Sequence, residues 1–222
     1  MPTDPLSIIL VLVLLVTSLG VHEAAHAWVA LKCGDSTARD LGRITLNPIA
    51  HIDLFMTILL PLMLLLSGMP PFGGAKPVPV AFHRLRNPWR DMCLVALAGP
   101  LSNFLLAILF GFIYKFVVDV MGMSPGGTGS YQILPKVMSV AVYFNLLLAA
   151  FNLIPIPPLD GSRILAWILP EGIRMTYVRF ERYGMFIVFG LIIWGGLFRI
   201  IGPVMDVMYD WVFNIVELGG LW

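Results

Sequence analysis

The chain has 222 residues, of which 59% are hydrophobic and only 12% are charged, and its formal net charge is +1. This composition is too apolar for a water-soluble globule of the same size, so we expect a single integral membrane domain over residues 1–222. A nearly neutral chain without a clustered basic face also gives no support for nucleic-acid binding.

The first predicted element is an apolar helix from Leu6 to about Ala30, which is long enough to cross the hydrocarbon core of a bilayer. No Lys or Arg precedes Lys32, whereas a cleavable signal peptide needs a basic start, so we expect this helix to be retained. In the loops that follow, residues 39–46 and 76–80 are predicted to form short β-strand elements. Either could offer a strand edge to another chain.

Five further apolar runs complete the predicted membrane part. They are Leu54 to Ser67, Met92 to Val118, Val137 to Ile154, Met185 to about Ile201, and Val204 to Val216. The expected fold is therefore an all-α polytopic membrane protein, a helical bundle of about four to six membrane segments. We expect the catalytic core within about 6–165 and C-terminal membrane segments within about 185–218.

The run at 54–67 is shorter than the roughly 20 residues of a spanning helix and contains Pro61, so a re-entrant segment is favoured over a full crossing. Lys and Arg occur in the loops on both sides of it, and the positive-inside rule places both loops in the cytoplasm. The loop 122–135 has neither residue type and is then external. The expected location is the inner cell membrane, with the active site toward the cytoplasm. Six full spans are the alternative topology.

The most specific motif is His-Glu-x-x-His, formed by His22, Glu23 and His26 inside the first apolar run. Residues four apart share one face of a helix, so both imidazoles can bind one metal ion while Glu23 projects beside them. Three ionisable groups within one turn at membrane depth are costly without a metal or a partner. The motif therefore favours one catalytic Zn²⁺ per chain over polar residues that are merely satisfied inside a bundle.

A catalytic zinc takes three protein ligands and leaves a fourth position to water, so a third ligand must come from elsewhere in the chain. Asp160 is the strongest candidate, because prolines between Asn152 and Asp160 interrupt a helix and can turn the carboxylate back into the bundle. An ordinary N-cap at the start of a helix reaching Leu169 explains Asp160 equally well.

Other ionisable residues have plainer explanations. His51 and His83 are alternative third ligands, but each lies in a basic loop, where a surface histidine is the more frequent case. Glu171 and Glu181 lie among arginines and are expected to form surface ion pairs.

Three motifs together resemble the site-2 protease family of intramembrane zinc metalloproteases. They are His-Glu-Ala-Ala-His at 22–26, Ala-Gly-Pro-Leu-Ser-Asn at 98–103, and Asn-Leu-Ile-Pro-Ile-Pro-Pro-Leu-Asp-Gly at 152–161. Residues 42–53 and 76–80 are similar to the short prokaryotic branch of that family, which is without the PDZ module or regulatory domain of some relatives.

The resemblance implies that His22, His26 and Asp160 hold zinc, that Glu23 is the general base, and that Asn152 engages the substrate. It implies hydrolysis of peptide bonds within or near transmembrane segments. The expected partners are therefore a transmembrane protein substrate and the lipid bilayer, while no particular oligomeric state is predicted.

A membrane metal-ion transporter and a non-catalytic metal-binding membrane protein are the alternative functions, because intramembrane ionisable residues suit both. The sequence shows no inverted repeat and one compact polar cluster, whereas a conduction path generally uses several sites. This difference favours the protease. Water would enter through a polar inlet, which Ser102 and Asn103 could support, although helix packing explains these two residues as well.

Overall fold

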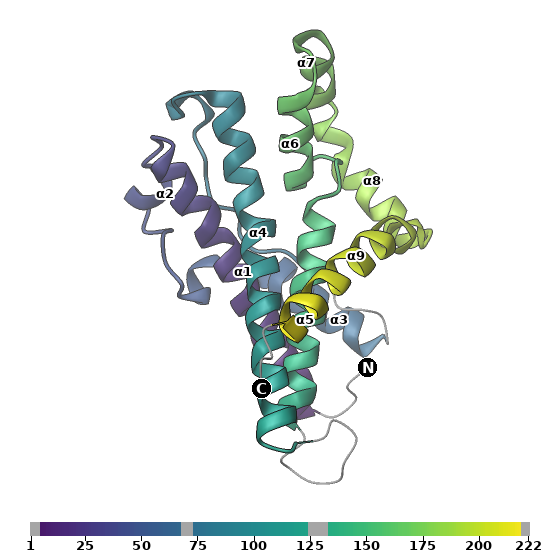
Figure 1. The fold of residues 1–222 in the computed structure, drawn as a ribbon. Coiled ribbons are helices and arrows are strands. Elements are labelled where there is room, and N and C mark those ends of the chain that lie inside the picture. The colour runs from purple at the N-terminus through teal and green to yellow at the C-terminus, as the bar shows by residue number, and fades with distance from the viewer. Residues whose placement is uncertain (1–4, 68–72, 124–132, 219–222) are drawn as a thin grey trace.

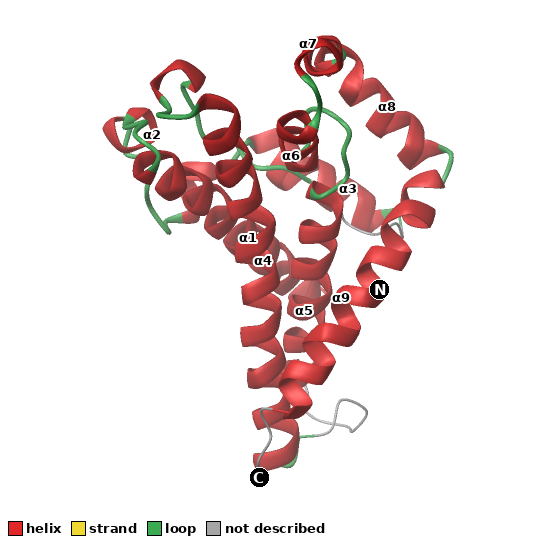
Figure 2. Cartoon of the chain, turned by 45° about the horizontal axis from the view of Figure 1, so that its top comes forward, coloured by secondary structure: helices red, strands yellow, loops and turns green. Residues whose placement is uncertain are grey.

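The computed structural model describes all residues except 1–4, 68–72, 124–132 and 219–222. Within that part the chain consists of helices joined by loops (Figure 2). Among the described residues, three helices are long and apolar enough to cross a membrane. They lie within α1 (Pro5–Lys32), α4 (Pro88–Lys115), which continues into the π-helical η4 (Phe116–Val120), and α5 (Ile133–Asn152).

The two faces of α4 show why this bundle belongs in lipid. Leucines at 97, 101, 105 and 109 recur every four residues and are 40–57% exposed. The opposite face, which includes Gly99, Asn103, Ala107 and Gly111, is buried. Large apolar side chains outside and small or polar ones inside are the pattern of a membrane helix, where small residues allow close helix contact.

The core forms where α1 and α5 pack against the C-terminal part of the chain. α8 (Glu181–Ile193) and α9 (Gly196–Leu218) supply its other wall. Its buried members are Leu15, Leu19, Phe144, Leu147, Leu148, Ala150, Phe151, Ile154, Val188, Leu197 and Ile201. This core fixes the position of α1 relative to the end of α5, which is the relationship that the candidate site requires.

The segment between α1 and α4 leaves and returns at the same end of the bundle, because Arg86 N donates to Cys33 O over 3.1 Å. It contains α2 (Thr37–Asp40), η1 (Pro48–His51), η2 (Leu54–Leu59), α3 (Leu60–Leu66) and η3 (Phe82–Arg84). η2 and α3 form a short apolar helical stretch that falls below spanning length. Figure 1 shows this segment beside the longer helices.

The β-strand elements predicted for the loops are wrong for the described residues. Residues 39–46 contain the end of α2 and a turn, in which Gly42 adopts a positive φ of 67°. Residues 76–80 have no regular secondary structure and pair with no strand. Pro77 and Pro79 carry no N–H for a ladder, and Val78 N donates to a side chain instead.

The C-terminal part begins with α6 (Asp160–Ile168) and α7 (Glu171–Arg179), which precede α8 and α9. The predicted apolar runs at 185–201 and 204–216 do not match the helix boundaries. Gly195, with a φ of 68°, separates α8 from α9, because a left-handed residue ends a helix. α9 then continues through Pro203, so the second run is joined to the end of the first.

Candidate functional site

α1 presents two histidines on one buried face. His22 and His26 are 4% and 8% exposed, and their Nε2 atoms are 3.0 Å apart. The spacing of four residues places both imidazoles on the same side of the helix, as the sequence predicted. Their rings meet edge to face, with centroids 4.6 Å apart.

Asp160 completes a triad with these histidines. Its Oδ2 atom lies 3.2 Å from His22 Nε2 and 3.3 Å from His26 Nε2. α5 ends at Asn152, and the proline-rich turn that follows brings the start of α6 back to α1. The N-cap explanation is wrong, because Leu159 occupies the N-cap and Asp160 is already helical.

The close contact between the start of α6 and the end of α5 requires a glycine at position 161, directly after Asp160. A Cβ atom on Gly161 would overlap the carbonyl groups of Leu153 and Ile154. The absence of a side chain lets α6 fold back directly onto the end of α5. The Leu-Asp-Gly sequence thus combines the candidate ligand Asp160 with the residue that allows its approach.

The donor set fits a zinc ion. Two imidazole nitrogens and one carboxylate oxygen lie within 3.0–3.3 Å of one another, and a tetrahedral zinc with bonds of about 2.0–2.1 Å spaces its ligands at about 3.3 Å. Asp160 Oδ2 is buried and has no hydrogen-bond partner, although both histidines face it.

The outer nitrogen of each imidazole has a fixed acceptor. His22 Nδ1 lies 2.6 Å from Asn103 Oδ1, and His26 Nδ1 lies 2.6 Å from Val95 O. Both acceptors are carbonyl oxygens, so each Nδ1 carries the proton and donates it. The Nε2 lone pairs are therefore directed at the site, which is the tautomer that a metal ligand needs.

Behind His22 lies a buried polar network. Asn103 Nδ2 donates to Asn145 Oδ1 over 3.0 Å, and Asn145 Nδ2 donates to Ser18 Oγ over 3.0 Å. Both asparagine side chains are fully buried. Sequence reasoning missed Ser18 and Asn145. The available signal was an amide in the apolar run of α5, where an unsatisfied polar group would be costly.

Gly99 allows α4 to pack directly on the histidines. A Cβ atom at this position would lie 2.5 Å from Cε1 of His22 and from Cε1 and Nε2 of His26. Such contacts are far inside van der Waals distance, so any side chain would displace an imidazole. The small residue in the 98–103 motif therefore preserves the positions of the two imidazoles.

Glu23 lies beside the triad and is 9% exposed. Its Oε2 atom accepts a hydrogen bond of 2.8 Å from Val78 N. Val78 belongs to residues 74–81, here called the strap, a stretch without regular secondary structure in the segment between α1 and α4 that lines the site. A hydrogen bond from a main-chain N–H to an ionised carboxylate is charge-assisted and therefore stronger than one between neutral groups.

A cavity of about 240 Å³ connects these groups. The triad, Glu23, the strap, α4 and the turn before α6 all line it. Asn152 lines it too, but its Nδ2 donates to Leu148 O of its own helix over 2.9 Å. Arg163, which sequence reasoning did not single out, also reaches the cavity and pairs with Glu181 of α8. The predicted ion pairing of Glu181 is thereby confirmed.

The alternative ligands lie elsewhere. His51 is 2% exposed, and its Nε2 donates to Thr45 O over 3.0 Å, so it is a buried structural residue. His83 is exposed. In the described part of the chain, the triad is the one group of three or more metal-binding side chains whose ligand atoms converge.

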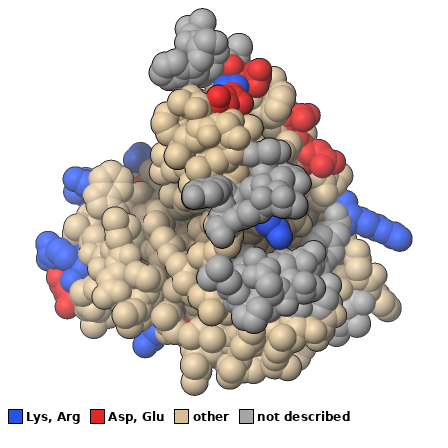
Figure 3. All heavy atoms as spheres, turned by 90° about the horizontal axis from the view of Figure 1, so that it is seen from below, with Lys and Arg blue, Asp and Glu red and all other residues tan. Residues whose placement is uncertain are grey.

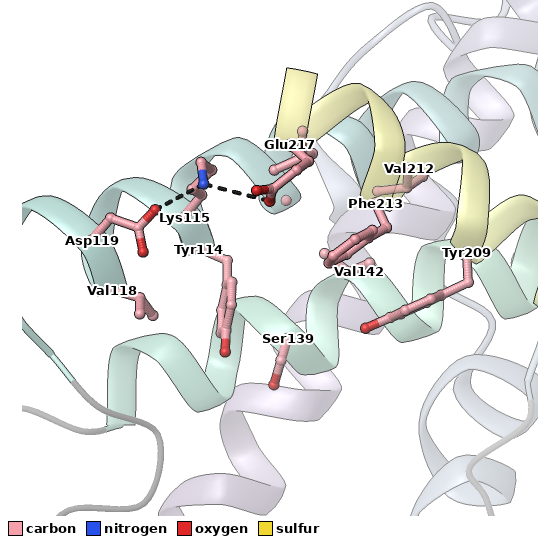
Figure 4. A pocket seen from close by; sticks show the side chains of 12 residues that line it. Tyr114, Lys115, Val118, Asp119, Ser139, Val142, Tyr209, Val212, Phe213 and Glu217 are labelled. Atoms are coloured by element: carbon pink, nitrogen blue, oxygen red, sulfur yellow. Dashed lines mark ion pairs between the residues drawn. The ribbon is translucent and has the colours of Figure 1, made fainter. Parts of the chain in front are cut away.

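A second cavity, of about 360 Å³, lies between α4, α5 and α9 near the opposite end of α4 (Figure 4). The cation that lines it is paired, because Lys115 Nζ lies 2.9 Å from Asp119 Oδ2 and 3.7 Å from Glu217 Oε2. Tyr114 and Ser139 also line it. Its lysine is paired with carboxylates, and no group of three metal-binding side chains converges among its described residues. The cavity beside Glu23, which has such a group, is therefore the candidate site.

Comparison with known proteins gives a consistent result. The profile of peptidase family M50 matches residues 10–195. YwhC of Bacillus subtilis (strain 168), whose name assigns it provisionally to the zinc metalloproteases, is 44% identical over 83% of this chain and 80% of its own length. Rip2 of Mycolicibacterium smegmatis, similarly named, is 27% identical over 88% of the chain and 72% of its own length. No solved structure matches.

Proposed function

The chain belongs to peptidase family M50, the site-2 proteases, and is a zinc metalloprotease; from this premise we propose that it cleaves membrane proteins within the bilayer. We assign His22, His26 and Asp160 as the zinc ligands. The observation that carries the assignment is the convergence of their three donor atoms within 3.0–3.3 Å from two distant parts of the sequence.

Zinc, when bound, supplies Lewis acidity that polarises the scissile carbonyl and makes water a stronger nucleophile. Glu23 is the group placed to act as general base. Its Oε2 is held by Val78 N, which leaves Oε1 to accept a proton from water and return it to the leaving amine. The triad contributes one carboxylate and two neutral imidazoles, so a dication there keeps a net positive charge toward the developing oxyanion.

The membrane setting rests on α1, α4 and α5, which are the helices with spanning length and composition. The end of α1, the start of α4 and the end of α5 lie at one end of the bundle (Figure 1). The loops at this end carry most of the Lys and Arg, so we place it in the cytoplasm. The opposite end, viewed in Figure 3, shows mostly uncharged side chains, with charged ones chiefly toward its margin.

The substrate is proposed to be a transmembrane segment that unwinds locally. The carbonyl groups of a helix are hydrogen-bonded internally, so attack requires an extended stretch. The cavity beside the triad is lined by Pro77, Val80 and Leu159 as well as by polar groups. Such a lining suits a short apolar peptide segment, and helix-breaking residues in the substrate are expected to increase the cleavage rate.

The proposal is tested with purified Glu23→Gln in detergent or proteoliposomes, a model transmembrane substrate and a zinc measurement. We expect one zinc per chain and a cleavage rate reduced at least about 100-fold. Asp160→Asn is the companion variant, in which zinc is expected to be lost together with activity. Cleavage by the Glu23 variant at the normal rate would refute the assigned base, and zinc transport into vesicles would favour the transporter.

A further inference from the structure

The strap is fixed to the rest of the protein at several main-chain points. Gly74 N donates to Met56 O over 3.0 Å, and Lys76 N donates to His51 O over 2.8 Å. At its other end, Ala81 N donates to Asp35 Oδ2 over 2.6 Å. The strap is therefore an anchored part of the site with a defined path.

The sequence of the strap leaves one donor opposite Glu23. Pro77 and Pro79 have no N–H, so Val78 is the single residue among 77–79 that can donate from the main chain. That N–H is bonded to Glu23 Oε2. With two prolines and the N–H groups of Lys76 and Val78 already bonded, the strap is poorly suited to accept a substrate strand.

Arg43 forms hydrogen bonds with the two residues of the strap that immediately precede Val78. Its Nη2 donates to Lys76 O over 2.7 Å and to Pro77 O over 3.3 Å, while its Nη1 donates to Ala50 O over 2.6 Å. No described carboxylate lies within ion-pair distance of it. The guanidinium thus donates its hydrogen bonds to main-chain carbonyl groups of the strap and of η1, and joins these two segments.

We propose that Arg43 is a positioning residue for catalysis, acting through the strap to aim the Val78 N–H at Glu23. This inference rests on the proposed role of Glu23 as general base. The planar guanidinium fixes two successive carbonyls, which sets the direction of the next N–H. That N–H holds one carboxylate oxygen, so the other faces the reacting water in a constant orientation. A lysine cannot reproduce this contact, because an ammonium lacks the fork that spans two segments.

The first test compares Val78→Pro, which removes the N–H, with Val78→Ala, which keeps it while also shortening the side chain. Loss of a hydrogen bond to a charged group corresponds to roughly a tenfold effect or more. We expect kcat of Val78→Pro to be about tenfold below that of Val78→Ala, with KM, zinc content and affinity for a zinc-binding hydroxamate the same in both. Equal kcat values in the two variants would overturn the proposal.

The second test asks whether Arg43 acts through Glu23. Arg43→Gln and Arg43→Lys are each expected to lower kcat about tenfold in the normal background. In the Glu23→Gln background the same changes should leave the residual rate unaltered, because the group being positioned is gone. A merely structural role would lower the residual rate in both backgrounds, and that result would contradict the proposal.

A third measurement does not depend on activity. Hydrogen exchange should show the Val78 amide protected in the wild-type protein and exposed in Glu23→Ala, with the Lys76 and Ala81 amides unchanged as internal references. Unchanged protection of Val78 would overturn the inference. If Glu23→Gln cleaves normally, the proposed function fails; if it is inactive while Val78→Pro equals Val78→Ala, only the role of the strap fails.

Discussion

His22 and Asn103, which are 81 positions apart in the sequence, share a hydrogen bond of 2.6 Å between Nδ1 and Oδ1. The bond joins α1 to α4 directly behind the candidate metal site. Because Asn103 is held in turn by Asn145, the orientation of the imidazole is set by three helices. The orientation of the His22 imidazole therefore depends on the packing of the bundle as well as on the motif on α1.

Replacing Asn103 with leucine should weaken zinc binding. The change leaves His22 Nδ1–H and Asn145 Oδ1 without their partners in the buried interior, so we expect zinc affinity to fall about 10–100-fold. Stability should fall by about 1–3 kcal/mol. Zinc titration against a competing chelator and thermal unfolding measure the two effects.

Ser102→Ala is the control for this change, because Ser102 is next to Asn103 but bonds only to Gly99 O of its own helix. It should leave zinc affinity within about twofold of the wild-type value. If Asn103→Leu bound zinc as tightly as Ser102→Ala, the network would have no part in orienting His22.

Comparison of sequence and structure shows which features a linear pattern can reveal. The pairing of the two histidines on one face follows from helical periodicity. The prolines before Asp160 made it a candidate without deciding between a ligand and an N-cap, and only the family resemblance favoured the ligand. The amide in the apolar run of α5 was a signal for a buried polar group, but its partners Ser18 and Asn103 were not predictable, because they depend on which helices face each other. The Val78 donor was missed for another reason, since a main-chain N–H leaves no trace in residue type.

Gly184 on α8 should be important for zinc binding, although it lies far from Asp160 in the sequence. A Cβ atom at position 184 would overlap the carbonyl group of Pro157, in the turn that leads to Asp160. Gly184→Ala should therefore shift that turn and lower both zinc affinity and cleavage, by about tenfold or more. Zinc stoichiometry after dialysis and the cleavage rate are the measurements.

The same helix offers a matched control in Gly190, around which a Cβ atom would meet nothing within 4 Å. Gly190→Ala makes the same chemical change, with the same gain in helix propensity, away from the turn. It should retain normal zinc binding. Equal behaviour of the two alanine variants would show that the contact between α8 and the turn does not position the third ligand.

The anchoring of the strap should depend on pH through Asp35, which is fully buried after α1. Burial raises the pKa of this carboxyl, but hydrogen bonds from Thr37 and Ala81 outweigh it and hold the pKa below its ordinary value. Since the folded-state pKa is lower than the unfolded value of about 3.9, the stabilisation is complete above that pH. It is lost as the pH falls through the folded-state pKa.

Asp35→Asn tests this dependence. The carboxylate accepts hydrogen bonds from Thr37 and Ala81 on its two oxygens, and an asparagine would place an NH₂ group in the position of one of these oxygens, against the donor there. We expect the free energy of unfolding to fall by about 1–3 kcal/mol at pH 7. The difference from wild type should shrink below about pH 4, where the Asp35 carboxyl of the unfolded wild-type chain begins to protonate. Denaturant unfolding in detergent at pH 7 and at pH 3 measures the difference in the free energy of unfolding. Asp40→Asn, at an exposed side chain of α2, is the control and should change this free energy little. A difference of the same size at pH 7 and pH 3 would show that the charge of Asp35 does not stabilise the strap.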